Sequence, residues 1–598
     1  MQPLDSASLG AAYAAGTATP DQILDEIFAR IASQGERPVW ITLAPRARVA
    51  ARLAENNRRR QAGENLPLFG IPFAVKDNID VAGLPTTAAC PGFAHVPERS
   101  ATVVEKLEAA GAVLVGKTNL DQFATGLVGT RSPYGICTSV FDPAYISGGS
   151  SSGSAVAVAA GLVGFALGTD TAGSGRVPAA FNNIVGLKPT KGLISTRGVV
   201  PACRSLDCVS IFAGTAGEAL RILSVAQGFD PADSYSRPAS AISIEAPPAG
   251  FRFGVPDQAL EFFGDEEAAT LFARAIDRLG GLGGAPVAID FTPFAEAARL
   301  LYQGPWVAER LAVLKSHGFD RPEDIHPVVR DIVAGAAQIS AAECFAGFYR
   351  LADLARAAER QWQTIDVLVL PTTGTTYTIE AVLADPLGLN SNLGRYTNFV
   401  NLMDLSAVAV PAGFRPNGLP FGVTVIGRAF EDGVVAAIGD RLHRTLESPT
   451  IGATGWKLPD APPEGPARPA AIPLAVAGAH LSGQPLNWQL TSRKARLAET
   501  VRSAPGYSLY ALAGTVPAKP GLIYDGAGRG LIELEIWELE PEGFGSLVAE
   551  IPPPLGIGTV ALEDGRKVKG FLCEAHAVVA AENITAFGGW RNWLARAP

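Results

Sequence analysis

Hydrophobic and polar residues follow one another over about the first 450 residues in a pattern that predicts helices between short buried strands. Residues 102–110 have the amphipathic spacing of a helix, Gly111 interrupts it, and residues 112–116 (AVLVG) follow as a strand. Residues 68–75 and 366–370 are apolar runs of strand length that end in turn residues or proline. Such a pattern predicts an α/β fold with a central sheet covered by helices.

The composition changes near residue 456. Residues 456–473 are dense in proline and alanine, which predicts a semi-rigid linker after a first domain of residues 1–455. Residues 474–598 contain strand-like runs at 531–539 and 569–573. We therefore expect a second, smaller domain of mixed α+β type.

The composition is that of a well-buried enzyme. Hydrophobic residues make up 47% of the 598 residues and charged residues 18%, a balance that argues against a disordered or scaffolding protein. The net charge is -9, and lysines and arginines are scattered rather than clustered. Nucleic acid is therefore not an expected partner.

Nothing in the sequence predicts a membrane, metal or cofactor site. The longest apolar stretch, residues 155–168, is shorter than the roughly 20 residues that cross a bilayer, and it is better interpreted as a buried helix leading into a strand. The N-terminus, MQPLDSASLG, lacks the basic run of a signal peptide. Six cysteines without a CxxC pair fit reduced thiols in the cytoplasm, and six scattered histidines have no metal-ligand spacing.

The segment with the most chemical information is residues 146–179, where two clusters of serine and glycine flank an apolar run. A plain loop, a phosphate-binding loop and a nucleophile elbow are the competing interpretations. The Walker pattern is absent, and the elbow requires a partnering histidine that is not nearby. A serine nucleophile still needs a base, and a lysine can serve when burial lowers its pKa. Lys76 is a candidate because it ends an apolar strand, although a solvated charge is the ordinary interpretation there.

Three motifs resemble the landmarks of the amidase signature family: KDN at residues 76–78, GGSSSGSA at 148–155 and GTDTAGSGRVPA at 168–179. NLDQFATG and NLMDLSAVAVPAG are further matches, so the resemblance spans nearly all of residues 1–455. It implies a mixed central sheet, with Ser174 as the nucleophile and neutral Lys76 as the final base. Ser150 would relay the proton between them, often through a cis peptide in that family.

The same resemblance implies an oxyanion hole built from backbone N–H groups of the loop around the nucleophile. Its donors would be Thr171, Ala172, Gly173 and Ser174. Ala172 replaces a glycine that is common in the family, which narrows the freedom of the loop but leaves its N–H groups in place. We also expect Asp170 and Arg176, which flank this loop, to form a structural ion pair.

The substrate must be predicted from other segments. Residues 302–310 read YQGPWVAER, which is compatible with an ordinary helix start that has Pro305 in its first turn and an exposed arginine in the next. The segment also resembles a motif of allophanate hydrolases, in which Tyr302 and Arg310 would hold the substrate's carboxylate. The planar fork of an arginine suits that task. In this resemblance Gly126 contributes a backbone contact.

The second domain points to the same family. GAHLSGQPLN at residues 478–487 resembles the start of the C-terminal domain of allophanate hydrolases, a fold similar to γ-glutamylcyclotransferases. The implied reaction removes ammonia from allophanate and leaves N-carboxycarbamate, which loses carbon dioxide spontaneously or with help from this domain. His480 is the first candidate for that help, while a structural hydrogen-bonding role is the more ordinary interpretation. Glu550 is expected at a strand end without a catalytic role.

Methionine occurs only at Met1 and Met403, so this sequence has no AMKM-type biotin attachment site. The resemblance therefore implies that a separate biotin-dependent urea carboxylase, or a route that degrades cyanuric acid, supplies allophanate. We expect a homodimer. Two alternatives stay open: an amidase for another small carboxylated amide such as malonamate, and a non-catalytic assembly subunit.

Overall fold

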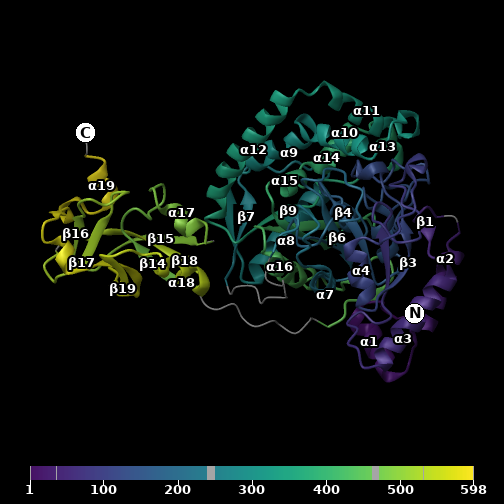
Figure 1. Ribbon diagram of the computed structural model, residues 1–598, viewed down its shortest axis with the longest axis horizontal. Coiled ribbons are helices and arrows are strands. Elements are labelled where there is room, and N and C mark those ends of the chain that lie inside the picture. The colour runs from purple at the N-terminus through teal and green to yellow at the C-terminus, as the bar shows by residue number, and fades with distance from the viewer. Residues whose placement is uncertain are drawn as a thin grey trace. The chain divides into compact units, whose positions relative to one another are not determined.

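The computed structural model describes residues 2–35, 37–238, 250–460, 471–493, 495–528 and 531–596 (Figure 1). The chain divides into two compact units. One comprises Met1–Gln361 and Ile365–Ala467, and the other comprises Trp362–Thr364 and Arg468–Pro598. Each unit has its own hydrophobic core.

Within the described residues, the first unit is built on a sheet of eleven strands in the order β1-β3-β2-β4-β6-β5-β10-β11-β9-β7-β8. β2 is parallel to both of its neighbours, β3 and β4, and β7 is parallel to β8 and β9. The other neighbours are antiparallel, so the predicted mixed sheet is confirmed. The strands are Trp40–Leu43 (β1), Pro72–Lys76 (β2), Val113–Thr118 (β3), Phe165–Asp170 (β4), Val185–Lys188 (β5), Cys208–Ala213 (β6), Arg252–Pro256 (β7), Ala285–Ile289 (β8), Val367–Pro371 (β9), Ser406–Phe414 (β10) and Pro420–Gly427 (β11).

Helices pack on this sheet in two groups. In one group, α5 lies on β2, β3 and β4, α6 lies on β5, β10 and β11, and the two helices contact each other. In the other group, α7 lies on β5 and β6, α16 lies on β10 and β11, and these two helices also contact each other. Figure 1 shows the sheet enclosed by these and the remaining helices of the unit. The helices are Ser6–Ala15 (α1), Pro20–Ser33 (α2), Arg46–Gln61 (α3), Thr102–Ala109 (α4), Ser152–Ala159 (α5), Val177–Phe181 (α6), Ala216–Ala226 (α7), Glu266–Gly281 (α8), Thr292–Gln303 (α9), Trp306–Ser316 (α10), Pro327–Gly335 (α11), Ala341–Trp362 (α12), Ile379–Ala384 (α13), Gly388–Gly394 (α14), Asn398–Leu402 (α15) and Asp432–Arg444 (α16).

Most elements named from the hydrophobic pattern are present, with shifted ends. The helix predicted at residues 102–110 is α4, and the strand at 366–370 is β9. The strand predicted at residues 68–75 is wrong in its first half, because β2 begins at Pro72. Before it the chain turns twice, through hydrogen bonds from Phe69 N to Leu66 O and from Ile71 N to Leu68 O. The turn is aided by Gly70, whose φ of 69° is costly for other residues.

The second unit contains two smaller sheets, a five-stranded one in the order β15-β18-β14-β20-β19 and a three-stranded one in the order β17-β16-β21. Trp537 and Trp590 lie fully buried in its core. The α+β prediction is therefore confirmed for the described residues. The strands are Ile472–Val476 (β14), Arg496–Arg502 (β15), Tyr507–Ala511 (β16), Pro520–Tyr524 (β17), Glu533–Leu539 (β18), Leu555–Ala561 (β19), Lys567–Cys573 (β20) and Glu582–Asn583 (β21), and the helices are Asn487–Thr491 (α17), Pro541–Ala549 (α18) and Trp590–Leu594 (α19).

The predicted linker, residues 456–473, lies partly outside the described residues, at 461–470. Its first residues form β13 (Trp456–Lys457), which pairs with β12 (Thr450–Ile451) in the first unit. Its last two residues open β14. The described ends of this segment thus have partners in the two units, because Trp456 packs on the first core and Ile472 pairs with Leu539. The domain limits at 455 and 474 stay predictions.

Among the described helices, none is by itself both long and apolar enough to span a bilayer. One pair, Pro327–Gln338 and Ala341–Trp362, meets that test of length and composition only when taken together, and it is bent by 101°.

Candidate active site

The candidate lysine and both serines come from one region of the large sheet. β2 ends at Lys76 and β4 ends at Asp170, and these two strands are parallel neighbours. Because neighbouring parallel strands end at the same edge of a sheet, their carboxyl-terminal residues lie close together. The segment before α5 carries Ser150, and the turn between β4 and α6 carries Ser174.

Lys76 is completely buried, and hydroxyl groups are its hydrogen-bond partners. Its Nζ lies 2.8 Å from Ser150 Oγ and 2.8 Å from Thr169 Oγ1. Burial lowers the pKa of Lys76 from its usual 10.5 to about 7, and the more distant carboxylates of Asp121 and Asp207 only partly oppose this effect. A large fraction of this amine is therefore neutral near pH 7, as a general base requires.

The acid that follows Lys76 in the sequence does not neutralise it. Asp77 is the first residue of the turn after β2, and its carboxylate lies 3.2 Å from Lys117 Nζ near the end of β3. Asp77 also accepts hydrogen bonds from the backbone and hydroxyl of Thr87. The protein thus buries two lysines at adjacent strand ends and gives a carboxylate partner to Lys117.

Ser150 is held by the loop that contains the NLDQFATG motif. The backbone N of Asp121 donates to Ser150 O at 3.0 Å, and Gly149 N donates to Leu127 O at 2.8 Å. The peptide bond between Gly149 and Ser150 is cis. Ser150 is fully buried and Ser174 is 3% exposed. No hydrogen bond joins the two hydroxyls among the described residues, so the second link of the relay stays a prediction.

The loop around Ser174 is braced by an ion pair with no exposed atoms. Arg176 donates from Nε and Nη2 to the two carboxylate oxygens of Asp170, at 2.9 and 3.0 Å. Burial alone would raise the pKa of Asp170, but the guanidinium of Arg176 holds it below its usual value. The ion pair that we predicted here is therefore present.

Asp170 also binds the backbone of the loop, which changes the expected oxyanion hole. Gly173 N donates to Asp170 Oδ1 at 2.8 Å, and Gly175 N donates to Oδ2 at 3.0 Å. The Gly173 N–H was one of our predicted oxyanion donors, and the structure gives it this carboxylate as its partner instead. The cause is the tight curl of the loop, in which Gly173 has a φ of 133°. Thr171, Ala172 and Ser174 remain the candidate donors.

The other side of the loop packs on the helices that carry the predicted substrate contacts. Thr171 Oγ1 donates to the buried carboxylate of Asp207. Ala172 lies in a hydrophobic cluster with Trp306 and Leu301, and Tyr302 packs against that cluster. The nucleophile loop and the α9–α10 junction are thus parts of one packed region.

Arg310 lies on α10 and is buried, with 3% of its surface accessible. An ordinary helix start would leave this arginine exposed. Its Nη1 donates to Thr125 Oγ1 at 2.8 Å. Its Nε and Nη2 are buried and have no partner among the described residues. Its Cζ lies 5.7 Å from the ring centre of Tyr302. The structure therefore brings Tyr302 and Arg310 together and places Gly126 next to the residue that binds the arginine.

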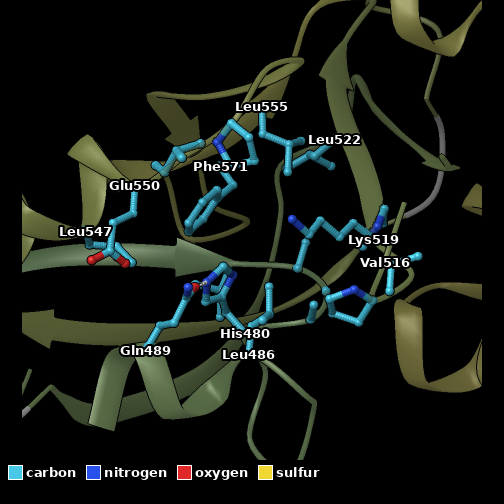
Figure 2. Close-up of a pocket in the computed structure, with 18 residues that line it drawn as sticks. His480, Leu486, Gln489, Val516, Lys519, Leu522, Leu547, Glu550, Leu555 and Phe571 are labelled. Carbon is cyan, nitrogen blue, oxygen red and sulfur yellow. Dashed lines mark hydrogen bonds between the residues drawn. The ribbon is translucent and has the colours of Figure 1, made fainter. Parts of the chain in front are cut away.

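His480 lies in the second unit and lines a cavity of about 200 Å³ (Figure 2). Its Nε2 is 2.8 Å from Gln489 Oε1, and its ring stacks on Phe571 with 4.7 Å between ring centres. Burial lowers the pKa of His480. Figure 2 shows the Lys519 side chain extending into the same cavity. Glu550 also lines the cavity. The expected strand end is wrong, because Glu550 directly follows helix α18. It accepts a hydrogen bond from Arg493, and we assign it no catalytic role.

Sequence reasoning missed two hydroxyls of this region, Thr125 and Thr169. Both stand inside quoted motifs, Thr125 directly before Gly126 and Thr169 directly before Asp170. Their partners, Arg310 and Lys76, are far away in the sequence, and only the tertiary structure brings them within hydrogen-bonding distance.

These features agree with the comparisons to known proteins. The chain belongs to the amidase family, which matches residues 22–435, and it is accordingly an amidohydrolase. Residues 472–595 match the allophanate hydrolase C-terminal domain. Both segments occur together in the allophanate hydrolase of Kluyveromyces lactis, whose solved structure is 42% identical, covers 97% of either chain and has a TM-score of 0.71.

Two curated relatives show how far the similarity extends. Urea amidolyase of Saccharomyces cerevisiae is 44% identical over 94% of this chain, but the match covers 32% of the yeast protein. Urea amidolyase of Lachancea kluyveri is 43% identical over 97% of this chain, and the match again covers 32% of the relative. The chain thus spans about a third of the length of the urea amidolyases that it matches.

Proposed function

We propose that this protein hydrolyses allophanate to ammonia and carbon dioxide, and that Lys76, Ser150 and Ser174 carry out the first step. The observation that carries the mechanism is the hydrogen bond from Lys76 to Ser150 in a fully buried site, where burial brings the pKa of the lysine to about 7. The similarity to K. lactis allophanate hydrolase over the full chain supports the choice of substrate.

In the proposed acylation, Ser174 Oγ attacks the terminal amide carbon of allophanate. Its proton passes through Ser150 to neutral Lys76, and the carbonyl oxygen takes the negative charge, stabilised by backbone N–H groups of Thr171, Ala172 and Ser174. When the C–N bond breaks, Lys76 returns a proton to the leaving nitrogen, and ammonia departs. Water then attacks the Ser174 ester by the same route in reverse, which releases N-carboxycarbamate and restores the free serine.

The substrate's carboxylate is proposed to bind Arg310. A buried guanidinium whose Nε and Nη2 have no hydrogen-bond partner in the described structure is costly unless an anion joins it. These two groups form the side edge of the guanidinium, and Arg176 uses the same edge to bind Asp170 with two hydrogen bonds. Tyr302 and the backbone at Gly126 complete the proposed contacts.

The second unit is proposed to assist the loss of carbon dioxide from N-carboxycarbamate. This product carries two negative charges, and the cavity beside His480 also presents Lys519. The hydrogen bond to Gln489 and the stack on Phe571 are equally what a structural histidine would have. The initial rates of carbon dioxide and ammonia release by the variant His480→Ala distinguish these roles, because a structural histidine leaves the ratio of the two rates unchanged while the fold is intact.

The decisive experiment measures ammonia release from allophanate by the full chain and by Ser174→Ala, which should lower kcat at least about 10³-fold. An inactive wild-type protein on allophanate that still hydrolyses malonamate would move the proposal to another acidic amide. An inert protein that co-purifies with a carboxylase would favour the assembly subunit. We also propose a homodimer and a functional link to a separate biotin-dependent urea carboxylase; light scattering and a coupled assay test these two points.

A further inference from the structure

Thr125 lies between two buried arginines and bonds to both. Arg310 Nη1 donates to its hydroxyl at 2.8 Å, and Arg131 Nη1 donates to its backbone carbonyl at 3.0 Å. The hydroxyl itself donates to Phe123 O at 3.1 Å. Thr125 is 1% exposed, so bulk water does not substitute for these partners.

The direction of these bonds fixes what the hydroxyl offers to Arg310. A threonine hydroxyl has one hydrogen, and Phe123 O receives it, so only lone pairs face Nη1. An arginine has no acceptor and its guanidinium is planar. The bond to Nη1 therefore holds one corner of the Arg310 guanidinium and orients its plane. The opposite edge, formed by Nε and Nη2, then faces away from Thr125. That edge is the one that is buried and has no hydrogen-bond partner within the described part of the chain.

The backbone of Thr125 is fixed by groups other than its hydroxyl. Phe123 and Ala124 have φ values of 50° and 53°, and this turn brings Thr125 towards α10. The carboxylate of Asp121 accepts hydrogen bonds from three backbone N–H groups of the same loop, those of Val128, Gly129 and Arg131. The loop is therefore held mainly by these backbone groups. The Thr125 hydroxyl adds one local bond, to Phe123 O, and one contact outside the loop, with Arg310.

We propose that Thr125 is a positioning residue for substrate selection: its hydroxyl presents the Nε and Nη2 edge of Arg310 to the substrate's carboxylate. Thr125 thereby sets the preference for acidic over neutral amides without touching the reacting atoms. This inference rests on the proposed function, because it requires that Arg310 bind a carboxylate.

The test compares malonamate with malonamide, two amides of equal size that differ in the carboxylate. In Thr125→Val the isosteric side chain keeps its volume but loses the hydroxyl, and with it both the acceptor for Arg310 and the local bond to Phe123 O. The ratio of kcat/KM for malonamate to that for malonamide should fall about tenfold or more, mainly through KM, and Thr125→Ser should restore it. The matched control is Thr424→Val, which removes an equally buried hydroxyl from β11, bonded to Thr372, and should leave the ratio unchanged.

A double-mutant cycle separates positioning from general structural support. In the background Arg310→Ala, the change Thr125→Val should have no further effect on the ratio, because its route of action is already removed. A further drop of the same size in that background would overturn the inference. So would an unchanged ratio in Thr125→Val with Arg310 present.

Binding of malonate, measured by calorimetry, distinguishes this inference from the function on which it rests. Malonate has the carboxylates but no amide to hydrolyse, so its affinity is read without turnover. Weaker binding in both Arg310→Ala and Thr125→Val supports both proposals. Weaker binding in Arg310→Ala alone overturns the role of Thr125 and keeps the carboxylate site. Unchanged binding in Arg310→Ala refutes the carboxylate site, and the role of Thr125 falls with it.

Discussion

Replacing the buried Lys76 by methionine should abolish activity and yet make the protein more stable. A shift of the pKa from 10.5 in the unfolded chain to about 7 in the folded protein means that burial disfavours the ammonium. At about pH 6, where both states bind the proton, that penalty is roughly 5 kcal/mol, since one pKa unit corresponds to about 1.4 kcal/mol. Methionine loses the bonds to Ser150 and Thr169, about 1 kcal/mol each, which leaves a net gain of roughly 3 kcal/mol.

The dependence on pH gives this prediction its sharpest form. Between pH 7 and pH 10.5 the unfolded chain binds the Lys76 proton and the folded protein does not, so the wild type gains stability as pH rises through this window. At about pH 9 the penalty has fallen to roughly 2 kcal/mol. The advantage of Lys76→Met over the wild type should therefore shrink by about 3 kcal/mol between about pH 6 and about pH 9.

Denaturant unfolding of both proteins at several pH values measures this difference, and ammonia release measures the activity. Lys117→Met is the matched control, because this second buried lysine has a carboxylate partner. Its removal leaves Asp77 buried without a cation and should destabilise the protein by about 3–5 kcal/mol. A stability advantage of Lys76→Met that does not change with pH would refute the assignment of a neutral lysine, as would a wild-type kcat/KM that does not decline below about pH 7.

Other contacts give three further predictions. Asp170→Asn breaks an ion pair without exposed atoms, so denaturant unfolding should show a loss of about 3–5 kcal/mol; a loss below about 1 kcal/mol contradicts this. Gly173→Ala places a Cβ 2.5 Å from Thr397 Oγ1, which should displace the loop that carries Ser174 and lower kcat for ammonia release about 100-fold. Gly418→Ala, also at positive φ but with no described atom near its Cβ, should leave kcat unchanged. Burial lowers the pKa of His443 to about 3, so the wild type loses stability as pH falls below about 6.5. In denaturant unfolding, the free energy of unfolding of His443→Phe should therefore rise by about 3 kcal/mol relative to the wild type between about pH 8 and about pH 4.

The sequence predicted those parts of the molecule that depend on local pattern. Apolar runs bounded by turn residues located β3, β9 and α4, and the motifs pointed to Lys76 and the two serines. The upstream end of β2 was misplaced because apolar character does not distinguish a buried turn from a buried strand.

The sequence could not predict the environment of a site residue where that environment comes from distant segments. Helical spacing on α10 is compatible with an exposed Arg310, but tertiary packing buries it and gives it Thr125 as a hydrogen-bond partner. Motif matching identified the loop around Ser174 but not which of its N–H groups stay free. That depends on how tightly the loop curls around Asp170, which takes the Gly173 N–H for itself.

The different partners of Lys76 and Lys117 have a consequence for covalent labelling. Acylating reagents attack the unprotonated amine. Lys76 has only hydroxyl partners among the described residues, whereas the Asp77 carboxylate next to Lys117 stabilises the charged form of that lysine. A reagent small enough to enter the site should therefore acylate Lys76 near neutral pH in preference to Lys117, although both amines stand at the ends of neighbouring strands. Peptide mass mapping would reveal this selectivity, and a bound carboxylate that fills the site should protect Lys76.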